Sequence, residues 1–350
     1  MSYRSDFLKV MSGERPEKFP ATEYMMFWPE TQEEYEKDTG TRDLAGYFGV
    51  ATPINIPYNF CAVPPFEEKV YEETETHITK RNGEGIIYKL EKNSSAMPHY
   101  IEFPIKDRAS FHEYCKRLDW KSEERVPDLT EFIRCVQRDD ILTQITIRGP
   151  FAFLRDFIKF EDLMILFIDE PEFIEEMVTF HTEFVIGLFG RVFGQFVPDI
   201  VCLGEDMAYK TASMISPAMV EEFICPAWDK IISFVKEAGV KHVFLDSDGH
   251  TADIIPLAVR SGFTAVSPIE RAAGMDPETL RARFPKLGLI GGVDKLELAK
   301  GKAEIDAELG KAERVYRTGR YIPSCDHSVP PIVSFSNYNY YISELKKRLK

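Results

Sequence analysis

The sequence lacks any apolar run long enough to cross a membrane. Its most apolar local stretch, residues 163–168, is far shorter than the roughly 18 residues that a bilayer span needs. The first 20 residues also lack the apolar core of a secretory signal peptide. We therefore expect a cytoplasmic protein that is not inserted in a membrane.

Three further absences narrow the class of protein. The six cysteines are widely spaced and form no CxxC pair, which disfavours a secreted disulfide framework. No cluster of Lys and Arg offsets the formal net charge of −14, so nucleic acid or an anionic membrane would be repelled. A glycine-rich phosphate turn after an early strand is also missing, which disfavours an open dinucleotide-binding sheet.

The second half of the chain alternates short β-type runs with helical patterns. This alternation predicts about six βα units and a parallel sheet. Ser216, Asp276 and Gly262 supply helix start and stop signals between the runs. The predicted strands are 144–149, 199–204, 241–246, 263–268, 287–292 and 320–325, and the predicted helices are 171–197, one from 216 onward, 251–261, one from 276 onward, 295–317 and 334–350.

These units favour a (β/α)8 TIM barrel that spans residues 1–350 as one domain. Residues 22–28 are the candidate first strand, and 56–61 are one option for the remaining strand. Residues 75–93 alternate around Asn82-Gly83, which predicts an antiparallel β-hairpin. We interpret this hairpin as an N-terminal insertion that caps one end of the barrel.

In a parallel α/β protein, ligands bind at the carboxyl ends of the strands, so the residues that follow each strand are informative. Five consecutive predicted strand ends present carboxylates. Such a concentration of charge requires a cation or protons, and it shifts pKa values in a way that suits acid–base chemistry. Each Asp or Glu has a plainer interpretation as a helix cap or a solvated loop residue. The residues are Glu205, Asp206, Asp246, Asp248, Glu270, Asp294 and Asp326, with the imidazoles of His250 and His327 beside them.

Asp246, Asp248 and His327 are the centre of the predicted catalytic site. Together with Glu205, they offer oxygen and nitrogen ligands that suit zinc or another first-row divalent metal. His250 has the plainer interpretation of a surface helix residue.

Three other features carry two interpretations each. Arg148 could clamp a substrate carboxylate or phosphate, or it could form an ion pair with a nearby acid. Cys325 could be a nucleophile or a soft metal ligand, or a small buried apolar residue. The aromatic stretch 335–345 places its rings on one helical face, which indicates core or the interface of a homodimer.

Four stretches resemble the uroporphyrinogen decarboxylase superfamily, which includes the decarboxylase of haem synthesis and cobalamin-dependent methyltransferases. The resemblance is clearest over 199–345 and implies a (β/α)8 barrel. The stretches are SPAMVEEFICPAWDKII, FLDSDGH, LIGGVDK and DHSVPPIVSFSNY.

Two departures from the superfamily pattern bear on function. The arginine-rich N-terminal motif that binds porphyrin propionates is missing, and residues 22–40 are acidic instead. In the methyltransferase branch, His-x-Cys after one strand and Cys in the last loop hold zinc. Asp246, Asp248 and His327 stand at these positions here, which is a harder ligand set that suits an oxygen-bearing substrate.

The resemblance leads to a methyltransferase as the first hypothesis. It would pass a methyl group from a small oxygen- or nitrogen-methylated donor to cobalamin on a separate corrinoid protein, with the metal as Lewis acid. Glu270 or Asp294 would position the donor, and Arg148 would bind its carboxylate. A metal-free decarboxylase is the alternative, with Asp246 or Asp248 stabilising a cation and His327 donating a proton. A non-catalytic barrel that binds a small molecule is the third hypothesis.

Overall fold

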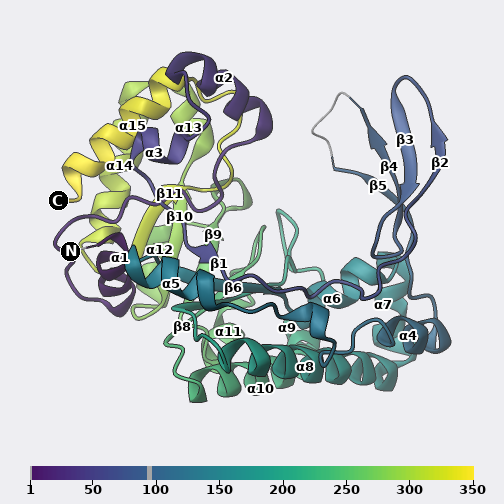
Figure 1. The fold of residues 1–350 in the computed structure, drawn as a ribbon. Helices are drawn as coiled ribbons and strands as arrows, with labels where there is room; N and C mark the ends of the chain where they lie inside the picture. Colours follow the sequence, from purple (N-terminus) through teal and green to yellow (C-terminus); the bar gives the residue numbers. More distant parts are fainter. Residues whose placement is uncertain (1, 93–96) are drawn as a thin grey trace.

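The computed structural model describes residues 2–92 and 97–350. Its centre is a curled, seven-stranded parallel sheet with helices around the outside (Figure 1), and the strand order is β1-β6-β7-β8-β9-β10-β11. Each neighbour in the sheet is the next strand of the set along the chain, as in a TIM barrel. The strands are β1 (Ile54–Asn55), β6 (Thr143–Arg148), β7 (Ile200–Gly204), β8 (His242–Asp246), β9 (Ala265–Ile269), β10 (Gly288–Val293) and β11 (Tyr321–Cys325).

The predicted first strand, 22–28, is not a regular strand. Instead it makes isolated parallel bridges to both sides of the sheet, from Thr22 to Ala51 before β1 and from Phe27 to Val329 beyond β11. Met26 has a positive φ of 57°, which interrupts extended pairing. Residues 56–61 follow β1 as irregular chain. The (β/α)8 prediction therefore holds as a TIM-barrel-like curled sheet with seven regular strands.

The helices begin and end largely where the cap signals predict. Ser216, Asp276 and Ser334 each accept a backbone hydrogen bond as N-caps, and Gly262 ends its helix with a φ of 103°. The helices are α1 (Tyr3–Ser12), α2 (Pro29–Thr39), α3 (Leu44–Phe48), α4 (Arg108–Cys115), α5 (Thr130–Arg138), α6 (Pro150–Phe157), α7 (Phe160–Asp169), α8 (Pro171–Phe193), α9 (Pro217–Met219), α10 (Cys225–Glu237), α11 (Ile255–Ser261), α12 (Pro277–Arg283), α13 (Lys295–Lys300), α14 (Lys302–Tyr316) and α15 (Phe335–Arg348).

Two stretches depart from the predicted helices. The helix expected over 295–317 is broken at Gly301, whose φ is 158°, into α13 and α14. Between β6 and the predicted long helix α8, the chain forms two further helices, α6 and α7, which the sequence pattern did not separate. Neither change alters the strand order.

The core closes the N-terminal end of the barrel. Phe7, Val10 and Met11 of α1 pack against inward-facing strand residues such as Ile200 and Phe244. The alternate residues of the same strands face outward into the helices and form the larger core. Tyr338 and Tyr341 of α15 belong to that outer core and are fully buried, which confirms the core interpretation of the aromatic stretch. The carboxyl ends of the strands are the end that α1 leaves uncovered.

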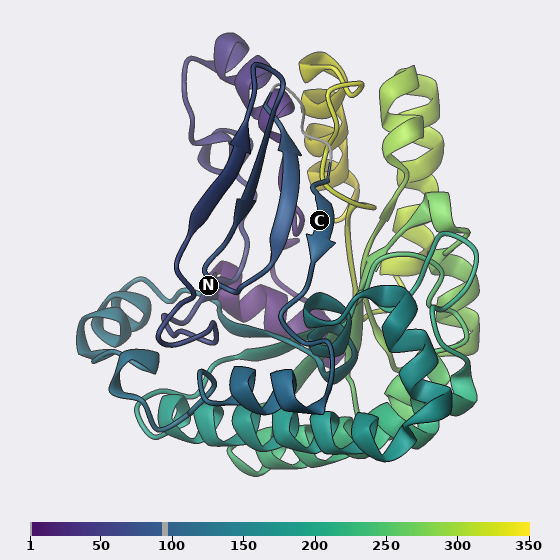
Figure 2. The same ribbon diagram turned by 90° about the vertical axis from the view of Figure 1, so that its right-hand side faces the viewer.

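The predicted hairpin is part of a four-stranded antiparallel sheet. Its strands are β2 (Lys69–Glu73), β3 (His77–Arg81), β4 (Ile87–Glu91) and β5 (His99–Glu102). β3 pairs with β4 from His77↔Glu91 to Arg81↔Ile87, which confirms the predicted hairpin. Residue 93, the last of the predicted range, lies outside the described residues. The sheet stands beside the barrel, above α6 and α7, in Figure 1 and Figure 2. Its outer strands are exposed, so it does not pack as a cap on the barrel.

Within residues 2–92 and 97–350, no helix is both long enough and apolar enough to cross a bilayer.

Candidate active site at the strand ends

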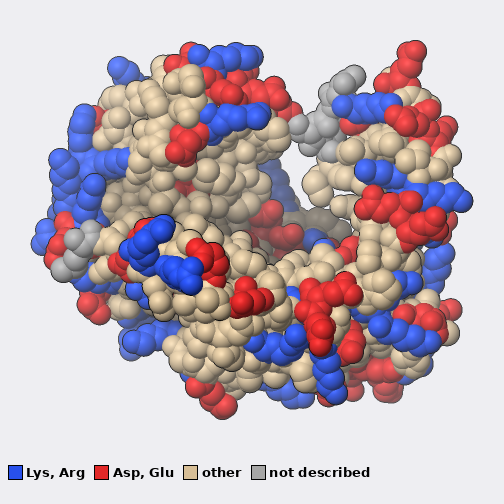
Figure 3. All heavy atoms as spheres, in the orientation of Figure 1, with Lys and Arg blue, Asp and Glu red and all other residues tan. Residues whose placement is uncertain are grey.

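The carboxyl ends of the parallel strands lie level with one another. Gly204 and Asp246 are paired at the ends of β7 and β8, and Asp246 pairs in turn with Ser267, two residues before the end of β9. Val293 and Cys325 are paired in the same way at the ends of β10 and β11. Figure 3 shows a hollow between the barrel and the four-stranded sheet, with acidic atoms inside it. The residues that follow these strands therefore share one site.

Asp246 is the last residue of β8, and its carboxyl holds a proton more tightly than a free one. Burial, together with the charges of Asp206 and Asp248, raises the pKa of Asp246 to about 7, while His327 opposes this shift. Beneath it, the Cys202 thiol lies 4.0 Å from Asp246 Oδ2. Asp246 is thus partly protonated at neutral pH, above a polar layer inside the barrel.

Asp248 and His327 form a pair across the mouth. His327 Nε2 lies 3.4 Å from Asp248 Oδ2, although the two residues are 79 positions apart in the sequence. This hydrogen bond raises the pKa of the His327 imidazole. Both side chains keep contact with solvent, at 42% for Asp248 and 25% for His327, so a substrate can reach them. The structure therefore brings together the three residues predicted as the catalytic centre.

Lys295 supplies a cation to this site, a role that the sequence analysis did not assign. Its Nζ lies 3.4 Å from Asp326 Oδ1 and 3.7 Å from Glu270 Oε1. Among the described residues this buried nitrogen has no hydrogen-bond partner. Glu270 also accepts a hydrogen bond of 3.1 Å from the Gly249 backbone, so it joins the loop after β8 to Lys295. The sequence does contain a signal for this role, because Lys295 is a single basic residue among the acidic residues that follow the strands.

Tyr24 is a second residue that the sequence analysis did not single out. Its hydroxyl lies 3.6 Å from Cys202 Sγ and 3.5 Å from Gln144 Oε1, inside the barrel beneath Asp246. Burial raises the pKa of Tyr24 well above its ordinary value, so the hydroxyl stays protonated. Tyr24 reaches this position because residues 22–28 cross the sheet as isolated bridges. The sequence analysis predicted a regular strand there and so did not assign Tyr24 to the site.

Arg148 takes up the ion pair that was its alternative interpretation. Its Nε donates to Asp156 Oδ2 at 2.7 Å, and its guanidinium stacks 4.9 Å from the ring centre of Phe60. Arg155 donates to the backbone oxygen of Asp206 at 2.8 Å. The two arginines therefore line the β6 and β7 side of the site with their charges already partly compensated.

Glu205 does not join the mouth, which corrects its assignment as a metal ligand. Its carboxylate is fully buried and accepts hydrogen bonds from the backbone of Phe151 and Ala152 at 2.9 and 3.1 Å. The Trp228 indole donates to its other oxygen at 2.5 Å. Glu205 thus caps the first turn of α6, because its side chain turns outward between the strands and helices.

Three other candidates have structural partners. Asp294 is the N-cap of α13, where its Oδ1 accepts from the Leu296 backbone at 2.8 Å. His250 Nδ1 donates to the Ala273 carbonyl at 2.8 Å. Cys325 is 1% exposed, and burial raises its thiol pKa well above the ordinary value, so it is a buried apolar residue.

The predicted metal set is not assembled. In the part of the chain that the structure describes, no three His, Cys, Asp or Glu side chains are grouped so that they could hold a metal ion. Asp248 and His327 hydrogen-bond to each other, Asp246 is partly protonated at neutral pH, and Glu205 lies at the start of α6. The donor set does not fit zinc in this arrangement.

A curled parallel sheet with titratable side chains at its strand ends places the chain among TIM-barrel-like α/β proteins with an acidic site. Residues 85–348 match the family model of uroporphyrinogen decarboxylase (URO-D), and the chain belongs to that family.

One solved structure supports the fold. A methyltransferase from Methanosarcina mazei has a TM-score of 0.64 at 16% sequence identity, and the match covers 99% of each chain. A B12-independent methionine synthase from Shewanella sp. W3-18-1, in complex with selenomethionine, has a TM-score of 0.49 at 9% identity over 95% of this chain and 97% of that one. The search of curated proteins gave no match.

Proposed function

We propose that this URO-D family member is a methyltransferase. It takes a methyl group from a small oxygen- or nitrogen-methylated donor and passes it to cobalamin on a separate corrinoid protein. The observation that carries the proposal is the Asp248–His327 pair beside the proton-holding Asp246 at an open strand-end site. The fold likeness to the Methanosarcina mazei methyltransferase over nearly the whole chain supports it.

The chemistry needs a proton donor at the leaving group. The electron pair of the acceptor forms the new bond to the methyl carbon, and the bond from that carbon to the donor oxygen or nitrogen breaks. The electrons of the broken bond stay on the donor atom, which takes a proton from the His327 imidazolium. Asp248 favours the charged imidazole through their hydrogen bond, and Asp246 is the second proton source.

The charges around Asp248 and His327 determine which methyl donors can bind. The charge of Lys295 acts on His327, and its ammonium makes ion pairs but no hydrogen bond among the described residues, so it can bind a carboxylate on the donor. Glu270 holds Lys295 in place, and Arg148 is a second cation on the opposite side. A small methylated carboxylic acid, such as a methoxylated aromatic acid, matches this distribution.

Methyl transfer to free cob(I)alamin, followed by its loss of absorbance, tests the proposal. Methoxylated aromatic acids and methylamines serve as donors. We expect His327→Gln and Asp248→Asn to lower the rate by about 100-fold or more, the usual scale for a lost general acid. Asp253→Asn is the matched control, because Asp253 is exposed on the loop before α11. No turnover with any donor, or equal rates in all variants, would contradict the proposal.

Metal analysis separates this proposal from the zinc hypothesis. With His327 and Asp246 as proton donors, chelation of the purified protein leaves its rate unchanged. Stoichiometric zinc, together with loss of activity on chelation, would instead support a rearranged set of Asp246, Asp248 and His327 as ligands.

Metal-free decarboxylation is the second candidate, favoured by one specific observation. Lys295 and His327 place a carboxylate-binding cation and a proton donor in the same mouth, as protonation of a carbanion after loss of carbon dioxide requires. Release of carbon dioxide from uroporphyrinogen, lost in His327→Gln, would favour this candidate over methyl transfer.

A further inference from the structure

A second cavity lies at the opposite end of the barrel from the candidate active site. It occupies about 470 Å³ between the C-terminal ends of α1, α14 and α15, a size typical of small-molecule sites, which span roughly 300–1,000 Å³. Gly319, on its wall, comes just before β11, whereas His327 comes just after that strand. We call it the basal cavity; its wall includes Gly13, Arg15, Phe19, Tyr316, Arg317 and Arg348.

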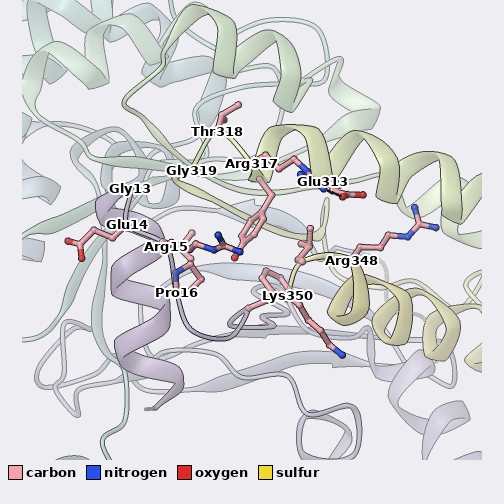
Figure 4. Close-up of a pocket in the computed structure, with 14 residues that line it drawn as sticks. Gly13, Glu14, Arg15, Pro16, Glu313, Arg317, Thr318, Gly319, Arg348 and Lys350 are labelled. Carbon is pink, nitrogen blue, oxygen red and sulfur yellow. Dashed lines mark hydrogen bonds and ion pairs between the residues drawn. The ribbon is translucent and has the colours of Figure 1, made fainter.

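The basal cavity is basic although the chain as a whole is strongly acidic. Four basic side chains line it against two acidic ones, which leaves two positive charges in excess (Figure 4). Two of the four are engaged at the rim, because Arg317 donates to Glu313 at 2.6 Å and Arg348 donates to Asp306. Such an excess attracts an anion.

Arg15 is, with Lys350, one of the two basic side chains of the wall that are not engaged in the ion pairs at the rim. In Figure 4 its guanidinium points toward the middle of the basal cavity. Basic residues near helix C-termini often serve to neutralise the last carbonyls. Here Gly13 N–H donates to Val10 and Arg320 donates to Met11 at 2.7 Å, so the end of α1 is already satisfied. Arg15 has no hydrogen bond or ion pair with any other described residue that would hold it for structural reasons.

Tyr316 adds a second free donor. Its hydroxyl is buried and has no hydrogen-bond partner within residues 2–92 and 97–350. Burial raises the pKa of Tyr316 to about 12, while the nearby charge of Arg15 opposes this shift, so the hydroxyl keeps its proton close to the guanidinium. The Phe19 ring packs edge-on against Tyr316 with centres 5.4 Å apart and supplies an apolar wall. A buried donor without an acceptor is costly unless a ligand supplies one.

We propose that the basal cavity binds a small organic phosphate monoester. The phosphate oxygens accept hydrogen bonds from Arg15 and Tyr316, and the organic body lies on Phe19 and the neighbouring apolar residues. A phosphate dianion carries a charge for each of Arg15 and Lys350, the two basic side chains of the wall that are not engaged in the ion pairs at the rim, whereas a carboxylate carries only one charge. The proposal concerns a site separate from the strand ends and does not depend on the reaction there.

Isothermal titration of the whole protein with phenyl phosphate tests the proposal, with benzoate and inorganic phosphate as comparison probes. We expect phenyl phosphate to bind at least tenfold more tightly than either. Arg15→Gln should weaken its binding at least tenfold, and Tyr316→Phe several-fold. Arg314→Gln is the matched control, because Arg314 lies on α14 like Tyr316 but is paired with Glu278 outside the cavity.

Four results would overturn the proposal. Absence of phenyl phosphate binding, or equal binding by Arg15→Gln, would remove the site. Benzoate binding as tight as phenyl phosphate would remove the preference for a dianion, and inorganic phosphate binding as tight would remove the role of the apolar wall. Arg15 is exposed and Tyr316→Phe conserves the ring, so thermal melts should show folded variants.

Discussion

Asp246 and Glu205 show why the type of a residue does not settle its role. The two residues lie at the ends of neighbouring strands, and burial is the main cause that raises the pKa of each carboxyl to about 7. Asp246 faces the mouth beside Asp248 and His327, whereas Glu205 turns outward and caps α6. The strand-end rule found both carboxyls and grouped Asp246, Asp248 and His327 correctly. The same rule could not predict which way the Glu205 side chain points. Successive side chains of a strand point to opposite faces, so a shift of one residue decides whether a side chain faces the site or the outer helices.

The proton on Asp246 leads to a prediction about the pH dependence of catalysis. Because the neutral form of Asp246 dominates only below about pH 7, we expect the rate of methyl transfer to fall above that pH, approaching tenfold per unit. Asp246→Asn is neutral at every pH and should remove the decline centred near pH 7, which leaves only the decline due to His327. The pH profile of kcat/KM measures both, and an identical profile in the variant would contradict the role of Asp246.

The hydrogen bonds of Glu205 lead to a prediction about stability. Glu205→Gln places an amide donor against the N–H groups of Phe151, Ala152 and Trp228, so we expect a loss of about 2–4 kcal/mol in the free energy of unfolding. Denaturant titration measures it. Glu222→Gln makes the same chemical change at an exposed position and should stay within about 0.5 kcal/mol of the parent. An unchanged free energy of unfolding in Glu205→Gln would show that the three hydrogen bonds of Glu205 contribute little to stability.

The elements were predictable where one local signal fixes each boundary. The six strands from β6 to β11 lie within two residues of their predicted ranges, because buried parallel strands are apolar runs with clear ends. The split between α13 and α14 depends on a single glycine, and α6 and α7 share one continuous apolar pattern with α8. The bridging role of 22–28 depends on contacts with residues 51 and 329, which no local pattern contains.

The junction of β6 and α6 provides a prediction at this scale. A Cβ on Gly149 would lie 2.1 Å from the Glu205 carboxylate, which three hydrogen bonds hold in place, so Gly149→Ala should destabilise the fold by about 2 kcal/mol or more. Gly310 lies inside α14 with only the Arg314 guanidinium near, at 3.8 Å. Gly310→Ala should therefore stabilise by about 0.5–1 kcal/mol. Thermal melts measure both effects. A change of melting temperature in the same direction for both variants would contradict the close contact between Gly149 and Glu205.

At the scale of the whole molecule, the barrel was more predictable than its attachments. The βα alternation and the family resemblance both lead to the curled parallel sheet, and the match over residues 85–348 confirms the family. The four-stranded sheet was predictable only as its central hairpin, because the exposed strands β2 and β5 carry no apolar alternation. The basal cavity was not predictable, since it forms where three helix ends distant in sequence meet.

Buried carboxyls distributed over the barrel make the stability of the whole molecule pH-dependent. Burial raises the pKa of Glu23, beneath α15, to about 8 and that of Glu205 to about 7, and both residues are fully buried. Their folded-state pKa values lie above that of a free Glu, so the folded protein holds these protons more tightly than the unfolded chain. The stabilisation is complete below the ordinary value of 4.5 and is lost as the pH rises through about 7 to 8.

We therefore expect the melting temperature to fall by about 2–5 °C between roughly pH 6.5 and 8.5. The buried His181, whose pKa burial lowers to about 3, has the opposite effect, but only below the ordinary histidine pKa of 6.5, so it does not obscure this window. Glu23→Gln removes one of these titrations, while those of Glu205 and Asp246 remain, so it should flatten the slope. Glu34→Gln, an exposed control, should not. Melts followed by circular dichroism measure the slope, and a melting temperature that is flat or rises across this window would contradict the shifted pKa values.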